Sequence, residues 1–333
     1  FDQPLDPART TVEVQVSPGF IPALIEALPY LVDYPYGCVE QTMSRFLPAA
    51  IVAKLLHELK LDPVAVERRI LPPTRRGPNG EPPAAGLGHL DDVVAQSIAR
   101  LVGMQNPDGS FGWFAQGEAD PYMTAYVLRG LNIARAAGIA VPEQMHERAY
   151  ERTMRFLAEK FEPALAPART AWVLAAVCGL PVPLDRLDDA KRQILLRTFG
   201  DLYAVRDNLT PAGIALLTQA AAALGRSNEL PVLRRNLENG VVRARSAEFG
   251  ATAQWGRTTN YYDGLEGAVE TTALSLQALL AIDPQHPLAD AAAAWLLVNR
   301  QSGRWSNTRD TALAVLALHG YARSRGDVTG GCR

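Results

Sequence analysis

The sequence predicts an all-α protein built from helical hairpins in series. Apolar residues recur at helical spacing, as in the segment 90–102, where they fall at positions 90, 93, 94, 98, 101 and 102. Strand-like alternation is scarce. A unit of roughly 40–60 residues recurs along the chain and is too short to bury its own apolar face. About six such hairpins, or about twelve helices, can close into an α/α toroid with an inner and an outer ring.

Helical periodicity locates the expected helices in chain order. They cover residues 20–32, 39–60, 90–102, 120–137, 143–161, 166–179, 186–198, 210–225, 229–244, 267–282, 287–300 and 308–323. Pro48 is expected to kink the second of these or to divide it in two. Pro- and Gly-rich stretches at 72–88 and 105–113 predict loops, and 246–264 has room for a short hairpin. We therefore expect one or two short β-hairpins in the loops.

A Thr-Ala step opens several of these helices. It occurs at Thr124, Thr170, Thr272 and Thr311, with separations of 46, 102 and 39 residues. The widest gap has room for one more unit, and Thr210-Pro-Ala begins at a suitable place within it. The alanine-rich segments 212–223 and 289–294 suit an inner ring, where small side chains permit close approach. Alanine also favours any helix, and both interpretations stay open.

Composition describes a globular protein. Of 333 residues, 48% are hydrophobic and 20% charged, with a formal net charge of −2. This near-neutral balance argues against a nucleic-acid or anionic-membrane partner. No apolar run reaches the length of a membrane span. We expect no cofactor and no metal. The start at Phe1, without an initiator methionine or a signal segment, leads us to expect that residues 1–333 form one domain of a larger protein.

Three cysteines, Cys38, Cys178 and Cys332, are too few for a disulfide framework. Cys178 lies in an apolar run, which predicts a buried thiol. The role of Cys332, the penultimate residue, stays open.

Cys38 and Gln41 form the most informative pair in the chain. If a helix opens at residue 39, positions i and i+3 lie on one face, about 5–6 Å apart at Cβ. A small closure would bring the thiol to the glutamine carboxamide, and loss of ammonia would leave an internal thioester. Such an activated acyl group must be hidden from water until it is needed. Tyr34, Tyr36 and Met43 offer apolar cover around it.

Two neighbours of the pair would support it. Gly37 gives the backbone room to turn just before the cysteine. Glu40 would lie in the first helical turn, where the helix dipole favours a carboxylate by about 0.3–1 kcal/mol. Such an acid is as well explained by this ordinary structural preference as by a chemical role.

Cys38 also has simpler explanations. A free cysteine is often a small buried hydrophobe. A cysteine at a helix N-terminus can instead be a thiolate nucleophile, but that chemistry needs a histidine partner. None of the five histidines lies in a recognisable signature with an orienting Asn or Asp; they are His57, His89, His146, His286 and His319.

The segment Gly37-Cys-Val-Glu-Gln41 resembles the thioester signature of the α2-macroglobulin and complement superfamily. Gly-Cys-Gly-Glu-Gln is usual in animals, and a bulkier third residue, here Val39, is common in bacteria. Residues 105–113, 269–273 and 295–311 also resemble the thioester domain of this family, so the resemblance spans about residues 15 to 324.

The resemblance implies an α/α-toroid domain of a bacterial protease inhibitor. In that family a protease cuts a bait segment elsewhere in the parent protein, and the exposed thioester then acylates an amine of the attacker. Cys38 would supply the leaving thiolate and Gln41 the acyl carbonyl. The expected partners are target proteases and sister domains. The domain would be a single-use trap in bacterial defence, not a turnover enzyme, in the periplasm or outside the cell. Any membrane anchor would belong to the parent, outside this chain.

One departure from the family concerns the nucleophile. In some complement-type members, a histidine after the Pro-Asp-Gly turn attacks the thioester first and directs the acyl group to hydroxyls. Alignment through Asp108-Gly109 and Gly130 places Thr124 or a neighbour there, and no histidine occurs between residues 89 and 146. We therefore expect direct attack by amines, with lysine preferred over carbohydrate.

Two other functions fit a helical toroid. Terpenoid cyclases and prenyltransferases share this architecture, but Asp91-Asp92 and Asp188-Asp189 lack the acid two positions earlier that a cyclase motif requires. No spacing of Asp, Cys and His suggests a prenyltransferase zinc site. Isolated Asp pairs usually cap helices. The remaining alternative is a toroid without an intact thioester that only docks against sister domains.

Overall fold

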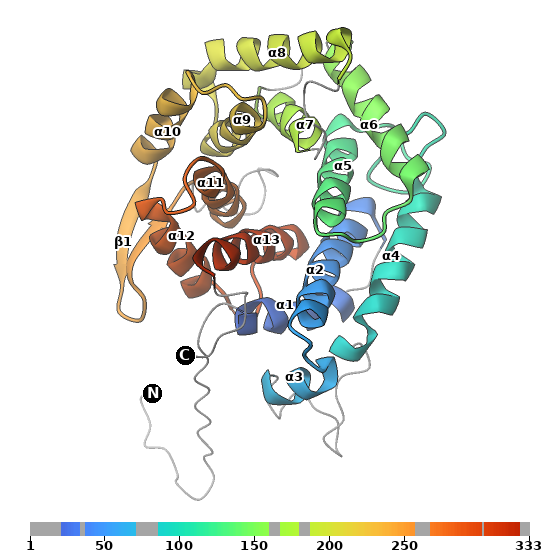
Figure 1. Ribbon diagram of the computed structural model, residues 1–333, viewed down its shortest axis with the longest axis vertical. Coiled ribbons are helices and arrows are strands. Elements are labelled where there is room, and N and C mark those ends of the chain that lie inside the picture. Colours follow the sequence, from blue (N-terminus) through green and yellow to red (C-terminus); the bar gives the residue numbers. More distant parts are fainter. Residues whose placement is uncertain are drawn as a thin grey trace, which may run out of the picture.

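The computed structural model describes residues 21–33, 37–70, 86–159, 167–179, 187–256, 267–301 and 303–326. These residues form thirteen α-helices, two 3-10 helices and one two-stranded sheet. The helices are arranged as two concentric rings (Figure 1). Among the described helices, none combines the length and the apolar character that a membrane span requires.

Six helices form the inner ring. They are α2 (Val39–Glu58), α5 (Pro121–Ala136), α7 (Pro167–Cys178), α9 (Pro211–Ala223), α11 (Ala268–Ile282) and α13 (Thr308–Arg325). Each contacts the next in this order, and α13 contacts α2. The ring is therefore closed, which confirms the α/α toroid.

The outer ring packs against the seams of the inner one. Its helices are α1 (Ile21–Asp33), α4 (Leu90–Met104), α6 (Glu143–Ala158), α8 (Asp189–Ala204), α10 (Leu230–Asn239) and α12 (Pro287–Val298). Outside the rings lie α3 (Pro63–Ile70), two 3-10 helices, η2 (Leu87–His89) and η4 (Arg206–Asn208), and a hairpin of β1 (Val242–Ser246) and β2 (Gly250–Gln254). The strands pair antiparallel, with Val242 opposite Gln254 and Ser246 opposite Gly250.

The two rings differ in burial because they differ in what surrounds them. An inner helix touches two inner neighbours and the outer ring, so α11 is buried continuously from Ala268 to Leu276. An outer helix buries only one face, and in α8 that face consists of Leu195, Thr198, Phe199 and Leu202. This arrangement requires outer helices that are amphipathic and inner helices that are apolar on nearly every side.

The Thr-Ala steps mark inner helices and explain the internal repeat. In three units the threonine hydroxyl accepts a hydrogen bond from the backbone N–H of an aromatic residue in the preceding loop. The pairs are Thr124 with Phe111 (2.9 Å), Thr272 with Trp255 (3.1 Å) and Thr311 with Trp305 (3.1 Å). The alanine that follows is buried at the contact with neighbouring helices. The repeat therefore encodes the joint between each loop and its inner helix.

The structure corrects four expectations about the helices. α2 is one continuous 20-residue helix with Pro48 inside it, because packing on both sides of the proline holds it together. α10 ends at Asn239, five residues early, since the chain passes Gly240 and pairs as β1. The alanine-rich segment 289–294 belongs to outer helix α12, which packs on β2 and α11. α3 was not expected at all. The predicted hairpin exists, although it begins at Val242.

Candidate functional site

The Cys38/Gln41 pair lies at the first turn of α2. Cys38 is the N-cap, with extended backbone (φ −112°, ψ 167°), and its Sγ accepts a hydrogen bond from the Gln41 N–H at 3.4 Å. The Gln41 side chain folds back, and its Oε1 accepts from the Gly37 N–H at 3.1 Å. This arrangement is a variant of the capping box: the N-cap side chain accepts from the N3 N–H as usual, but the N3 side chain reaches back to Gly37, one residue before the N-cap. The two side chains thus converge across one helical turn.

The pair is accessible although the helix behind it is not. Gly37 is exposed and Cys38 and Gln41 are half-buried, whereas Val39 between them is fully buried. The Val39 N–H donates to the Trp113 carbonyl at 2.9 Å, which fixes the 105–120 loop against the start of α2. In that loop the side chain of Trp113 is 43% exposed and that of Phe114 is 61% exposed. Two exposed aromatic residues therefore stand beside the motif.

Burial raises the pKa of the Cys38 thiol. The hydrogen bond from the Gln41 N–H lowers it in part, and the charge of Glu40 raises it again. The thiol is therefore protonated at neutral pH, contrary to what a thiolate nucleophile requires. All five histidines lie in the described part of the chain. Two of them are hydrogen-bonded to residues outside the motif, His146 to Asn132 (2.7 Å) and His286 to Glu238 (3.1 Å).

Glu40 is the first member of a polar network beneath the motif. Its carboxylate accepts hydrogen bonds from the Ser44 hydroxyl at 2.6 Å and from the Thr308 hydroxyl at 3.2 Å. Ser44 and the Tyr126 hydroxyl are 3.0 Å apart. Burial raises the pKa of Glu40 above its usual range. Through Thr308, Glu40 connects the first inner helix with the last.

The network continues around Arg309 on α13. The Arg309 guanidinium forms an ion pair with Glu270 of α11 (2.8 Å) and donates a hydrogen bond to the Tyr122 hydroxyl of α5 (3.2 Å). The neighbouring Asp310 is buried, and this burial, followed by the charge of Glu270, raises its pKa to about 6. Arg309 is thus paired with Glu270, and its positive charge also lowers the pKa values of Glu40 and Asp310 in part, at the N-terminal end of the inner ring.

These residues occupy equivalent positions in the repeat. Tyr122, Glu270 and Arg309 each lie two residues before the threonine of a Thr-Ala step, and Glu40 lies two before Thr42. The caps are equivalent as well. Cys38 stands where other inner helices have Asp120, Thr210 or Asn307, and each of these caps likewise accepts a hydrogen bond from the N–H three residues later. Cys38 therefore takes the place of an ordinary N-cap.

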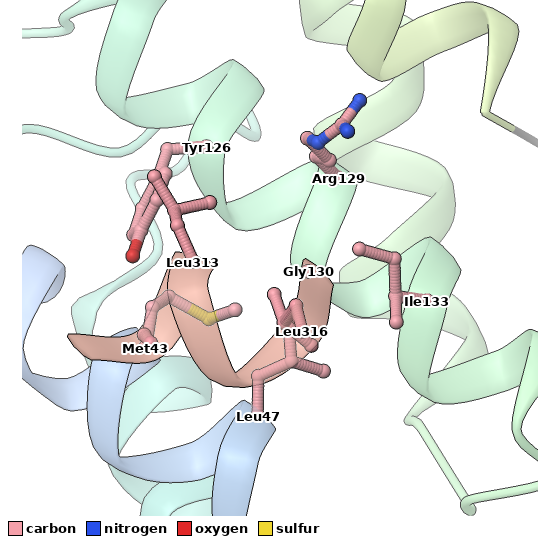
Figure 2. Close-up of a pocket in the computed structure, with 9 residues that line it drawn as sticks. Met43, Leu47, Tyr126, Arg129, Gly130, Ile133, Leu313 and Leu316 are labelled. Atoms are coloured by element: carbon pink, nitrogen blue, oxygen red, sulfur yellow. The ribbon is translucent and has the colours of Figure 1, made fainter. Parts of the chain in front are cut away.

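The other predicted site residues are placed as follows. Tyr34 and Tyr36 lie outside the described residues. Met43 is buried and points toward Gly130 in a small pocket between α2, α5 and α13 (Figure 2). A Cβ at Gly130 would lie 2.0 Å from the Met43 Cε, so the glycine makes this close packing possible. The shielding role of Met43 and both tyrosines stays a prediction.

Sequence reasoning did not identify Ser44, Tyr126, Thr308 or Arg309 as part of the site, nor Trp113 beside it. The Thr-Ala register held a signal for Arg309 and for its partners, because equivalent positions in a ring lie at one level. Ser44 lies four residues after Glu40 on one helix, a spacing that could have indicated their contact. No local pattern marks the contact of Glu40 with Thr308, which lies 268 positions away.

Residues singled out for alternative functions have structural roles. Thr124 is fully buried and holds the loop at Phe111. Asp188 caps α8 by accepting from the Lys191 N–H at 2.8 Å. Asp91 and Asp92 are exposed in the first turn of α4. The described residues contain no group of three or more His, Cys, Asp or Glu arranged to hold a metal ion.

The family model of the A-macroglobulin TED domain matches residues 11–164, which include the motif and the 105–120 loop. The match covers just under half of the chain, and it makes the A-macroglobulin thioester-containing domain (TED) the domain that this part of the chain resembles. Curated relatives of the TED include the alpha-2-macroglobulin of Thermotoga maritima, 33% identical over 133 residues, and that of Ralstonia nicotianae, 32% identical over 157 residues. These alignments cover 40% and 46% of this chain but only 7% and 8% of the relatives' lengths.

Solved structures show the same fold over nearly the whole TED. Native alpha-2-macroglobulin from Escherichia coli, spanning domain MG7 to the C-terminus, aligns with a TM-score of 0.62 at 19% identity over 89% of this chain and 42% of that one. Salmonella alpha-2-macroglobulin reacted with methylamine aligns with a TM-score of 0.63 at 20% identity over 90% of this chain and 17% of that one. The toroid is therefore the fold of the TED region in these proteins.

Proposed function

We propose that Cys38 and Gln41 form an internal thioester. The Cys38 sulfur bonds to the Gln41 Cδ, the bond from Cδ to the amide nitrogen breaks, and the thiol proton leaves with that nitrogen as ammonia. The capping geometry supports this proposal, because it already folds the two side chains toward each other across the first turn of α2. The convergence of Cys38 and Gln41 is the observation that carries the proposed function.

The thioester would then acylate an amine. The attacking nitrogen bonds to the Gln41 Cδ, the Cδ–S bond breaks, and the proton lost by the nitrogen balances the charge by forming the Cys38 thiol. The acyl oxygen would keep the hydrogen bond that Gly37 now donates to the Gln41 Oε1. That N–H would stabilise the negative charge that develops on this oxygen during attack.

Within a longer protein the TED would serve as a single-use trap for proteases. The parent would be cleaved by the protease, and the exposed thioester would be consumed in linking to a lysine of that protease. The match of residues 11–164 to the TED model and the similarity to bacterial alpha-2-macroglobulins support this role. We place the protein in the periplasm or outside the cell, where foreign proteases are met. Residues 1–333 would form one domain of the parent.

We propose that amines attack directly. Thr124, the residue that aligns with the complement histidine, is buried and accepts a hydrogen bond from the Phe111 N–H. The histidines His146 and His286 lie away from the motif and are hydrogen-bonded to Asn132 and Glu238. Trp113 and Phe114 would rest against a sister domain in the parent, which would exclude water from the bond until cleavage. Their exposure beside Val39 supports this.

Intact mass under denaturing conditions tests the bond. We expect a mass lower than that of the sequence by one ammonia, and we expect Cys38 to resist alkylation until methylamine is added. Methylamine should then restore the thiol and add its own mass to Gln41. The Cys38→Ser variant is the control and should show the full sequence mass. Full mass with immediate alkylation of Cys38 in the unmodified protein would contradict the proposal and leave the docking module as the better function.

A second measurement tests the nucleophile. The protein is incubated with equal concentrations of methylamine and glycerol, and the adducts on Gln41 are quantified by peptide mass spectrometry. Amide adducts should dominate. Faster labelling by glycerol would show that a group in the site diverts the acyl group to hydroxyls.

A further inference from the structure

Arg129 is a buried cation on the inner wall of the toroid, away from the motif. It lies on α5 and only 9% of it is exposed. Its side chain borders the pocket that Met43 and Leu47 of α2 share with Leu313 and Leu316 of α13. Figure 2 shows the guanidinium at one end of this group, directed away from Met43 and Leu47. The charge thus lies at the rim of an apolar depression.

Side chains from three other inner helices hold the guanidinium in place. The Arg129 Nη2 donates to the Gln219 Oε1 of α9 at 2.6 Å and to the Gln277 Oε1 of α11 at 2.8 Å. The guanidinium carbon lies 5.6 Å from the centre of the Trp172 ring of α7. Gln219 is itself oriented, because its Nε2 donates to the Leu274 carbonyl at 3.0 Å. The guanidinium is therefore fixed by neutral groups.

Within the described residues no carboxylate pairs with Arg129. Burial is the cause of its lowered pKa, about 10, and no acidic group counteracts this effect. Both hydrogen bonds that Arg129 forms with described residues use Nη2, so the Nε–H and the two Nη1–H groups have no acceptor among those residues. A buried arginine is ordinarily paired, because an unpaired buried charge costs several kcal/mol. By contrast, the other buried arginine of the inner ring, Arg309, has Glu270 at 2.8 Å.

We propose that Arg129 is the anchor of a carboxylate-binding site on the inner wall of the toroid. The carboxylate accepts hydrogen bonds from the Nε and Nη1 groups and supplies a negative charge that no described residue provides to Arg129, since Glu270 of α11 is paired with Arg309. Charge-assisted hydrogen bonds of this kind are among the strong ones. The carboxylate comes either from a small free anion or from an acidic side chain of another protein segment. The site is independent of the thioester.

The test measures thermal stability of the full 333-residue chain in acetate and in chloride at constant ionic strength. A ligand that binds the folded state raises the melting temperature along a saturable curve. We expect such a curve for acetate, and its absence in Arg129→Met, which keeps the length of the side chain and removes the donors. Arg197→Gln is the matched control, because Arg197 is an exposed arginine on α8 and its replacement should leave the curve unchanged.

A second titration distinguishes the two sources of the carboxylate. It uses the end-blocked peptide Gly-Glu-Gly, whose only charge is a side-chain carboxylate. Saturable stabilisation by either probe that Arg129→Met abolishes supports the site, and the tighter probe identifies the source. If Arg129→Met does not fold, Arg129→Lys replaces it and should bind both probes more weakly, since an ammonium lacks the planar donor array. No saturable effect of either probe on the unmodified protein, or equal binding by the variant, would overturn the proposal.

Discussion

At the scale of single residues, the Cys38/Gln41 pair is a modified helix cap. Serine, threonine, aspartate and asparagine are the usual N-caps, and this protein uses Asp120, Thr210 and Asn307 in that way. Cys38 fills the same position with a sulfur atom that is a weaker acceptor. The three-residue spacing of Cys38 and Gln41 is thus the N-cap to N3 spacing of a capping box.

The cap can be separated from the chemistry by two substitutions. Both Cys38→Ser and Cys38→Ala remove the sulfur, but only serine retains a cap acceptor for the Gln41 N–H. We expect the alanine variant to be less stable than the serine variant by about 1 kcal/mol. Denaturant unfolding of the two variants measures this difference. Equal stabilities would show that the Gln41 N–H needs no side-chain cap.

Asp310 gives a prediction about pH. Burial, followed by the Glu270 charge, raises its pKa from 3.8 to about 6, so the folded state binds this proton more tightly than the unfolded state. The resulting stabilisation is present below pH 3.8 and is lost as pH rises through about 6. For about two pKa units, the loss is on the order of 3 kcal/mol. The Asp310→Asn variant should not show this loss of stability, because its side chain does not titrate. The variant should therefore gain stability relative to the parent between pH 4 and 7.

Asp290 is the control for that experiment because its pKa moves the other way. Although burial alone would raise it, hydrogen bonds from Tyr321 and Arg325 lower the pKa of Asp290. Its stabilisation is therefore present above pH 3.8 and is lost as pH falls through the lowered value. Asp290→Asn should lose stability relative to the parent as pH rises. Urea unfolding at several pH values compares all three proteins, and parallel curves for the parent and Asp310→Asn would contradict the assignment.

At the scale of elements, the inner helices depend on the joint between their first turn and the loop before it. Thr311 shows this joint clearly, because its hydroxyl accepts from the Trp305 N–H and also donates to the Asn307 carbonyl at 2.7 Å. The Thr311 hydroxyl and the Trp305 N–H are both buried. Removing the hydroxyl leaves the Trp305 N–H without an acceptor, which costs the full desolvation of that group.

Thr311→Val should therefore lower the free energy of unfolding by about 1–3 kcal/mol. The matched control is Thr218→Val on α9, an equally buried threonine whose hydroxyl donates only to the Ile214 carbonyl one turn earlier. That carbonyl keeps its helical hydrogen bond, so the control should lose less than about 1 kcal/mol. Denaturant unfolding measures both. A control as damaging as Thr311→Val would mean that the joint contributes nothing specific.

The sequence predicted the type of an element wherever helical periodicity extended over a long stretch. It did not predict where the elements begin and end. The stretch 229–244 shows why, since the backbone pairing of β1 with β2 overrides helical spacing after Gly240. α2 shows the opposite case, where burial from Val39 to Leu56 outweighs the helix-breaking tendency of Pro48. In the site, Cys38 and Gln41 were predictable because their contact is local. Thr308 was not predictable, because closure of the ring brings it to Glu40, and only the Thr-Ala register gave a signal for Arg309.

At the scale of the whole molecule, ring closure determines which parts are most stable. Inner helices such as α9 and α11 are enclosed by neighbours on nearly every side, whereas α8 and α10 each bury one face. Opening an inner helix exposes core surface on both of its inner neighbours, so it requires breaking the ring. An outer helix can detach locally at a lower free energy.

Hydrogen exchange measured by mass spectrometry should reflect this difference. The slowest amides should lie in α9, α11 and α13 and exchange only through global unfolding. Amides of α10 should exchange faster, because only Leu233 and Leu237 are buried along that helix. Addition of a low concentration of denaturant should accelerate the inner amides more than those of α10. Similar protection in α10 and α11 would contradict the two-ring account of stability.

The contact between α13 and α2 also sets the order in which the site can be completed during synthesis. Cys38 and Gln41 leave the ribosome early, but the Thr308 hydroxyl that Glu40 accepts from comes 268 residues later. A nascent chain can therefore form the first turn of α2 long before its surroundings exist. The Cys38/Gln41 pair therefore acquires its final surroundings only when the last inner helix has joined the first, after nearly the whole domain has been synthesised.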